Sequence, residues 1–137
     1  MSDIVPIQTT EAPAPAGHYS QGIACGDLVF VSGQLPVRDG GDHSLAQEGF
    51  EPQARRALAN LLAVLKAGGA APRDVLRVTI YLSDVADWPS CNAIYADFFG
   101  DSRPARTIVP VGPLHYGYRI EVDAIARRPV PAHPSHG

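Results

Sequence analysis

Residues Arg103–Ala126, RPARTIVPVGPLHYGYRIEVDAIA, hold two β-rich runs joined by a Gly-Pro-Leu-His-Tyr-Gly connector. The runs, Ala105–Val111 and Tyr118–Ala126, are expected to form neighbouring strands. Arg106 lies at the start of the first run and Glu121 in the middle of the second. A guanidinium that leaves water in an apolar strand needs an anion, because an unpaired buried charge is costly. That anion is either the Glu121 carboxylate or the carboxylate of a ligand.

Working outward from this stretch, hydrophobic periodicity predicts the other elements. A Gly-containing turn joins His18–Ala24 to Leu28–Gly33 as a hairpin. Apolar residues at three- and four-residue intervals predict helices from about Glu51 or Gln53 to Ala67 and over Trp88–Phe99. The coarse order is β-β-α-β-α-β-β. It indicates an α+β fold with one sheet and both helices on one face.

Finer expectations follow from the same patterns. In the strand Val75–Leu82, the residues Leu76, Val78, Ile80 and Leu82 should share one face. Asp87 is a suitable N-cap for the second helix, and Gly100 a suitable C-cap.

Proline, alanine and threonine dominate Met1–Gly17, which is predicted to be an extended arm, and the last ten or so residues are predicted to form a mobile tail. A single domain should therefore occupy 1–137, with its core at about 13–127.

The strand at Leu28–Gly33 is apolar on both faces. Leu28 and Phe30 point one way, and Val29 and Val31 the other. Such a strand belongs in a sheet that is covered on both sides. Two helices cover only one side, so a second copy of the chain is expected on the other side. The sequence therefore predicts a homo-oligomer.

Composition excludes several classes of function. The 137 residues carry a net charge of −3 and no basic stripe that would neutralise nucleic-acid phosphates. No apolar run is long enough to cross a membrane, and no signal peptide is recognisable. The cysteines, Cys25 and Cys91, are far apart and fit a reduced, cytoplasmic setting as small hydrophobes, with a reactive thiol as the alternative. Metal-ligand spacings, a serine triad and phosphate-binding loops are all lacking.

Each polar candidate also has a purely structural interpretation. Glu121 alternates with apolar residues, so it belongs either to a solvated face or to a site in which a carboxylate positions water or moves a proton. Asn92 is expected on the surface of the second helix. The glycine-flanked segments Tyr19–Gln21 and Ser32–Gln34 form either structural turns or places where the backbone approaches a ligand.

Five segments taken together are more specific: GHYSQG at 17–22, VFVSGQLP at 29–36, NAIYADFFG at 92–100, PARTIVPV at 104–111 and IEVDAIA at 120–126. In this order they make the chain resemble the RidA/YjgF family of reactive enamine/imine deaminases, also called endoribonuclease L-PSP. The resemblance covers about residues 13–127. It implies a chorismate mutase-like fold and a homotrimer with a central barrel, with active sites between neighbouring subunits.

The resemblance also assigns roles to individual residues. Arg106 falls on the arginine that binds the substrate carboxylate, and Glu121 on the glutamate that helps to place the hydrolytic water. Other matched positions bind the substrate: Tyr19, Ser32, Gly33, Asn92, Thr107 and Ile108. The implied reaction converts 2-imino or 2-enamino acids, such as 2-aminoacrylate, to 2-keto acids and ammonia without a cofactor. The implied partners are a small imino, enamino or keto acid and further copies of the chain.

The chain departs from the family pattern near the expected pocket. His18 replaces a common proline, Thr107-Ile108 replaces a Ser-Cys or Ser-Thr pair, and Pro113–Tyr118 replaces a Leu-Pro loop. These departures leave open a larger substrate, such as an aminomuconate-type intermediate. His115 and Tyr116 either reach the site or belong to a surface loop, which is the favoured interpretation. A ligand-binding or chaperone-like trimer and RNA cleavage are the alternative functions.

Overall fold

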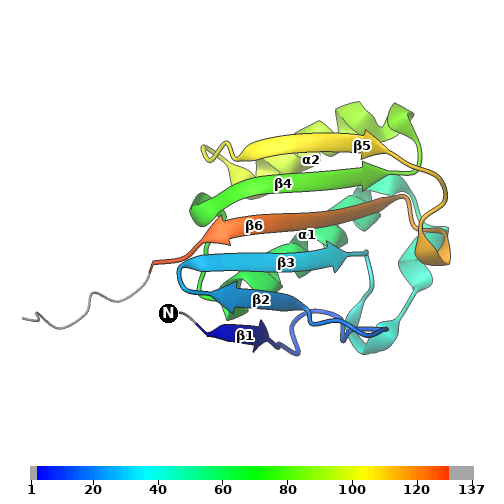
Figure 1. Cartoon of the computed structure of the whole chain (residues 1–137). Helices are drawn as coiled ribbons and strands as arrows, with labels where there is room; N and C mark the ends of the chain where they lie inside the picture. The colour runs from blue at the N-terminus through cyan, green and yellow to red at the C-terminus, as the bar shows by residue number, and fades with distance from the viewer. Residues whose placement is uncertain (1–2, 130–137) are drawn as a thin grey trace, which may run out of the picture.

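The computed structural model describes residues 3–129 and contains one mixed sheet and two helices (Figure 1). The helices are α1 (Phe50–Ala67) and α2 (Trp88–Phe99), and short 3₁₀ turns lie in the connections. The strands are β1 (Ile4–Ile7), β2 (Gly22–Cys25), β3 (Leu28–Gln34), β4 (Val75–Leu82), β5 (Ala105–Pro110) and β6 (Ile120–Arg127). The predicted tail falls largely outside the described residues.

The six strands are ordered β1-β2-β3-β6-β4-β5. All neighbouring pairs are antiparallel except β4 and β5, which run parallel because α2 connects them as a crossover. The expectation that β5 and β6 are neighbours is wrong, because β4 lies between them. A parallel pair needs a crossover, and β5 uses it to reach the free edge of β4 while β6 returns to the centre of the sheet.

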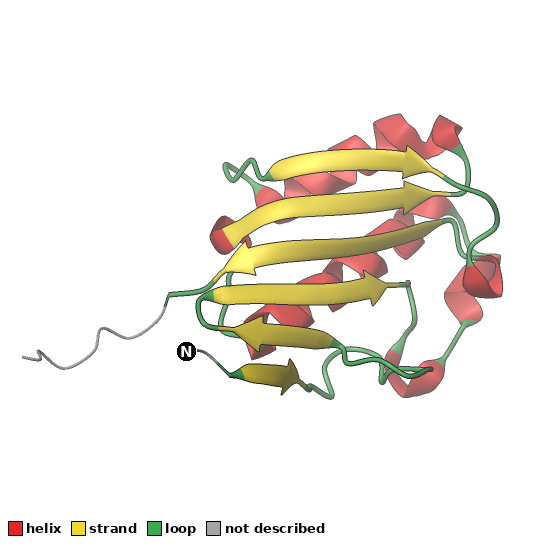
Figure 2. Cartoon of the chain, in the orientation of Figure 1, coloured by secondary structure: helices red, strands yellow, loops and turns green. Residues whose placement is uncertain are grey.

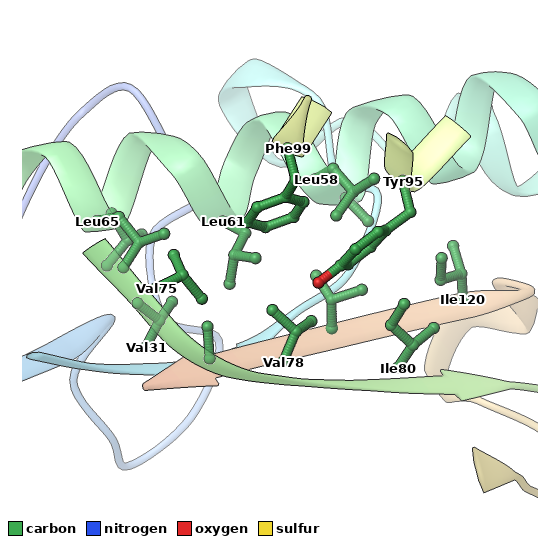
Figure 3. Packing of buried hydrophobic residues seen from close by; sticks show 14 of the residues in the cluster. Val31, Leu58, Leu61, Leu65, Val75, Val78, Ile80, Tyr95, Phe99 and Ile120 are labelled. Carbon is green, nitrogen blue, oxygen red and sulfur yellow. The ribbon is translucent and has the colours of Figure 1, made fainter. Parts of the chain in front are cut away.

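Both helices cover the same face of the sheet, as predicted (Figure 2). The core lies between them and the strands, and Figure 3 shows α1 and α2 contributing side chains from one side and β3, β4 and β6 from the other. Leu58, Leu61 and Leu65 on α1 recur at three- and four-residue spacing and are almost fully buried. The fold of the chain therefore follows the periodicity of its sequence closely.

No helix of the described residues covers the opposite face of the sheet (Figure 2). Val29 and Val31 of β3 are buried under the helices, whereas Leu28 is 36% and Phe30 is 40% exposed. The predicted alternation of β3 is thus confirmed, and its second apolar row faces outward in a single copy. Glu121, Asp123 and Ile125 of β6 lie on the same face, between core residues of that strand.

The prediction that Leu76 shares a face with Val78, Ile80 and Leu82 of β4 is wrong. Leu76 is 48% exposed, and Val75 is buried in its place. The pairing of β4 with β6 shifts between Val75 and Arg77, which indicates a β-bulge. An extra residue in one strand moves the side chains that precede it to the opposite face of the sheet. Strict alternation along the sequence does not predict this change.

The N-terminal arm is more ordered than predicted. Ile4–Ile7 forms the edge strand β1, which pairs with β2. The following segment, residues 9–16, folds back over the end of β2, where the buried side chain of Gln21 holds it. Gln21 Oε1 accepts the Thr9 N–H at 2.7 Å, and Gln21 Nε2 lies 2.9–3.3 Å from the carbonyl oxygens of Thr9, Ala12 and Pro13.

The ends of α2 are partly as expected. Gly100 ends the helix with φ of 57°, a conformation that favours glycine. Asp87 makes no side-chain cap, contrary to prediction. Its carboxylate instead accepts two hydrogen bonds from the Arg119 guanidinium, at 2.7 and 3.1 Å. A bidentate charged pair outweighs a single capping bond, and it fastens the start of β6 to the start of α2.

Replacing Gln21 with leucine should destabilise the protein by about 1–3 kcal/mol, because one donor and several acceptors of the arm would lose their partner. The shift of the urea midpoint measures this loss. Gln8→Leu is the matched control, since Gln8 is exposed on the same arm. Equal midpoints for the two variants would contradict the role assigned to Gln21.

Candidate functional site

Glu121 stands at the centre of a hollow on the open face of the sheet. Two adjoining cavities meet there. The arm cavity, of about 510 Å³, runs under residues 9–16, and the loop cavity, of about 620 Å³, runs toward Ser32 and His115. Tyr19, Gly33 and Glu121 line both. Four of the predicted site residues therefore lie together: Tyr19, Ser32, Gly33 and Glu121.

Gly33 allows the Glu121 side chain to lie flat against the end of β3. A Cβ atom at position 33 would come within 2.5 Å of Glu121 Oε2. Any larger residue would have to push the carboxylate away, since a real Cβ does not tolerate such a contact. Ser32 is fixed beside it by a 2.6 Å hydrogen bond from its hydroxyl to the Ser20 carbonyl. The glycine thus sets where the carboxylate lies.

The charge of Glu121 is held in an unfavourable place. Burial raises the pKa of its carboxyl above the usual value, the nearby Asp123 raises the pKa further, and His115 acts in the opposite direction. Within the described residues, its carboxylate forms no ion pair and no hydrogen bond. A half-buried carboxylate with free lone pairs and a raised pKa is suited to holding water or moving a proton.

Arg106 lies on the other side of the sheet, on the edge strand β5. Its Nη1 donates to Asn92 Oδ1 of α2 at 3.0 Å, and its guanidinium carbon lies 4.8 Å from the centre of the Tyr95 ring. The Tyr95 ring contacts one face of the planar guanidinium and Asn92 binds one of its nitrogen atoms, so the two contacts together fix its orientation. Among the described residues no carboxylate pairs with it. Its remaining donors are available to an anion.

Tyr95 supports Arg106 from within the core. Its ring stacks on Phe99 and reaches from α2 toward the strands (Figure 3). Burial raises the pKa of Tyr95 to about 12, so the phenol stays neutral. Its hydroxyl is the one buried side-chain polar atom of the described residues without a hydrogen-bond partner. Burial likewise raises the pKa of the neighbouring Cys91 thiol to about 11, which makes a reactive thiolate there unfavourable.

An Arg106–Glu121 salt bridge, the structural alternative raised from the sequence, does not form. Arg106 leaves β5 toward the helices, whereas Glu121 leaves β6 on the open face, and β4 lies between the two strands. Strands are about 4.8 Å apart, and the sheet itself separates the two side chains. One copy of the chain therefore cannot bring both to the same small ligand.

The two positions after Arg106 differ from each other. Thr107 is exposed on the open face, where its hydroxyl accepts a 2.8 Å hydrogen bond from Arg77. Ile108 is buried in the core, so only its backbone is open to a ligand role. Asn92 is on the surface as predicted, although its contact with Arg106 was not foreseen.

Sequence reasoning missed one wall of the hollow. Tyr116 lines both cavities, His43 lines the arm cavity and His115 the loop cavity, so the favoured interpretation of residues 115 and 116 as a plain surface loop is incomplete. Tyr116 has φ of 61°, the one positive φ of a non-glycine residue in the described chain. The aromatic residues of Pro113–Tyr118 were the available signal. The contribution of His43, more than seventy positions away, had none.

Comparison with known proteins identifies the group to which these features belong. The family model described as Endoribonuclease L-PSP matches residues 9–128. The chain belongs to this family. The resemblance to RidA/YjgF proteins noted from five short segments is thereby confirmed across most of the chain.

Relatives in the L-PSP family carry different names. A RutC family protein of Pyrococcus horikoshii is 41% identical over 88% of this chain and 94% of its own length. The 2-iminobutanoate/2-iminopropanoate deaminase of Mus musculus is 38% identical over 88% of each chain. A crystal structure of E. coli TdcF with bound serine matches 91% of this chain and 99% of its own, with a TM-score of 0.85 and 33% identity.

The described residues contain no group of three or more histidine, cysteine, aspartate or glutamate side chains arranged to hold a metal ion. They also contain no helix that is long and apolar enough to span a membrane.

Replacing Glu121 with glutamine should stabilise the protein at pH 7. A raised pKa means that the folded state binds the proton more tightly than the unfolded state, so the ionised form carries a stability cost. This cost is present above the folded-state pKa and disappears as the pH falls through it. The advantage of Glu121→Gln in melting temperature should therefore shrink on acidification. Glu11→Gln, at an exposed arm position, is the control, and a Glu121→Gln variant less stable than wild type at pH 7 would contradict the prediction.

Proposed function

We propose that this chain hydrolyses 2-imino and 2-enamino acids, of the 2-aminoacrylate type, to 2-keto acids and ammonia. The observation that carries the proposal is Arg106, whose guanidinium is fixed by Asn92 and Tyr95 and forms no ion pair with a carboxylate of residues 3–129. A planar fork of free donors binds a carboxylate in two-point fashion. Such a clamp would fix a small acid at one end and leave its C=N carbon at a defined place.

Relatives support the same chemistry. The mouse relative is named for deamination of 2-iminobutanoate and 2-iminopropanoate, both short 2-imino acids. The E. coli TdcF structure is described with bound serine, a small molecule with a carboxylate and a nitrogen on the adjacent carbon. All three compounds contain the carboxylate that Arg106 would bind in this chain.

The complete site requires two copies of the chain. Arg106 and Glu121 leave opposite faces of the sheet, so Arg106 of one copy would approach the Glu121 hollow of its neighbour. The apolar side chains of Leu28 and Phe30 on the open face supply a surface that a closed assembly would bury. A homotrimer with three such sites, its sheets around a central barrel, fits this arrangement and the family resemblance.

In this arrangement the chemistry needs only positioning and proton transfer. Arg106 binds the carboxylate while Glu121 accepts a proton from a water molecule as its oxygen bonds to the carbon of the protonated imine, which gives a neutral carbinolamine. The protonated Glu121 then gives its proton to the carbinolamine nitrogen and takes the proton of the hydroxyl group. The C–N bond breaks as the C=O bond forms, ammonia leaves, and Glu121 returns its proton to ammonia or to solvent. An enamine enters the same path after it takes up a proton on carbon.

Arg106→Ala should lower kcat/KM for release of pyruvate from 2-aminoacrylate by about 100-fold, because the substrate loses its anchor. Arg106→Lys keeps the charge without the fork and should recover only part of the rate. Arg103→Ala, at an exposed position on the approach to β5, should match wild type. Equal rates for wild type and Arg106→Ala would remove the proposal, and ligand protection against heat without turnover would favour a binding protein instead.

Co-expression of Arg106→Ala with Glu121→Gln chains should restore activity that neither variant has alone. If subunits mix at random, about one quarter of two-copy sites would combine an intact Arg106 with an intact Glu121. The double variant gives the background rate, and light scattering reports the mass of each assembly. Activity no higher than in the separate variants, or a monomeric mass for wild type, would contradict a shared site.

RNA cleavage, which the name of the family model suggests, is less well supported. The chain has a net charge of −3 and an isoelectric point near 5.9, whereas nucleic-acid sites are basic. The cavities around Glu121 are lined by no arginine or lysine.

A further inference from the structure

The arm cavity is larger than a short imino acid needs. Its volume of about 510 Å³ lies in the range that holds ligands of many heavy atoms. It begins at Glu121 and continues away from the loop cavity, between residues 9–16 and the loop that contains His43. A substrate whose reacting carbon lies near Glu121 therefore has room for a bulky side chain in this direction.

Aromatic groups form the far wall of this cavity. The His43 and Tyr116 rings stack with centroids 3.8 Å apart and planes 22° apart. His43 is held from behind, because its Nδ1 lies 2.7 Å from the hydroxyl of the buried Tyr118. Tyr116 nevertheless stays 44% exposed, so part of its ring surface is available to a ligand. Tyr19 adds a third aromatic ring near Glu121.

The backbone at Tyr116 indicates that this ring is placed with some strain. A φ of 61° is rare for a residue with a bulky side chain, and such outliers concentrate at ligand sites. The Tyr116 ring stacks on His43 and contacts the His115 ring at a tilt of 51°, and these aromatic contacts help to offset the cost. In this conformation the Tyr116 side chain lines both cavities and keeps part of its surface exposed.

The charges of the arm cavity select against acidic side chains. Its charged lining groups are two carboxylates, Asp39 and Glu121, and none of its lining residues is arginine or lysine. Arg56 pairs with Asp39 at 2.9 Å from outside this lining. A substrate with a second carboxylate, such as an aminomuconate-type intermediate, would meet these carboxylates with no arginine or lysine among the lining residues to bind it. A flat, uncharged group meets aromatic and small apolar surfaces.

We propose that the His43–Tyr116 stack is the side-chain subsite of the active site, and that the preferred substrates are 2-imino acids with aromatic side chains. This inference rests on the proposed deaminase function and names the substrate class of that site. The aromatic ring lies against Tyr116 in the arm cavity, the reacting carbon lies at Glu121, and Arg106 of the neighbouring copy binds the carboxylate.

The test uses the full-length protein and imines generated in place by an amino-acid oxidase from phenylalanine, leucine, alanine and glutamate. Keto acid release gives kcat/KM for each. Wild type should prefer the phenylalanine imine over the alanine imine by about tenfold, with leucine between them and glutamate last. Equal values for phenylalanine and alanine, or a preference for glutamate, would overturn the inference.

Variants locate the preference. Tyr116→Asn removes the ring but tolerates a positive φ, so the backbone is kept, and the phenylalanine-to-alanine ratio should fall about tenfold. Tyr116→Phe keeps the ring and the ratio. Trp88→Ala removes an exposed aromatic residue that lines neither cavity and should leave the ratio unchanged. An unchanged ratio in Tyr116→Asn would overturn the subsite.

Failure of the inference is distinguishable from failure of the proposed function. If the alanine imine is hydrolysed without preference for phenylalanine, only the subsite is wrong. If no imine is hydrolysed, the deaminase proposal is wrong, and calorimetry with phenylpyruvate and pyruvate still decides the subsite. Tighter binding of phenylpyruvate that Tyr116→Asn abolishes would support it, and equal affinities would overturn it.

Discussion

The alternation of β6 is the constraint on which this structure depends. Ile120, Val122, Ala124 and Ala126 are buried beneath the helices, and their burial fixes the register of the central strand. Glu121 is consequently forced onto the uncovered face, where Gly33 leaves just enough space for its carboxylate. The same register places Arg119 where its guanidinium reaches Asp87 at the start of α2. A slip of one residue would bury the carboxylate in the core and dismantle the hollow.

Several features of the hollow and of the Arg106 region lower the stability of the folded protein. A half-buried, unpaired carboxylate at Glu121 and a strained backbone at Tyr116 both cost free energy. The buried and unpartnered hydroxyl of Tyr95 is a third cost, beneath Arg106. Burial of apolar side chains between the helices and the sheet stabilises the fold enough to offset these unfavourable free energies. These three unfavourable features lie at or beside the two candidate catalytic groups, Glu121 and Arg106. Such clustering is typical of a site that is kept for binding or catalysis.

Local periodicity was sufficient to predict both helices, five of the six strands and the two-sided character of β3. It failed where a residue's environment depends on non-local pairing. The bulge that exposes Leu76, the insertion of β4 between β5 and β6, and the ordering of Ile4–Ile7 as an edge strand are all set by partners distant in sequence. The family resemblance supplied Arg106 and Glu121 as a pair, but their separation by the sheet required the structure. The sequence carried no signal for His43, because its stacking partner, Tyr116, is distant in the sequence and only the fold brings the two together.

The fastening of residues 9–16 by Gln21 has an evolutionary consequence. This segment forms one wall of the arm cavity, and its hydrogen bonds to the rest of the chain come mainly from the Gln21 side chain to its backbone. Apart from Ala12, which is buried in the core, its side chains are therefore free to vary without disturbing the sheet, Glu121 or Gly33. Insertions and substitutions there would reshape the cavity while the reacting groups stay in place. Changes confined to residues 9–16 could therefore alter which ligands fit the arm cavity, while Glu121 and Gly33 remain unchanged.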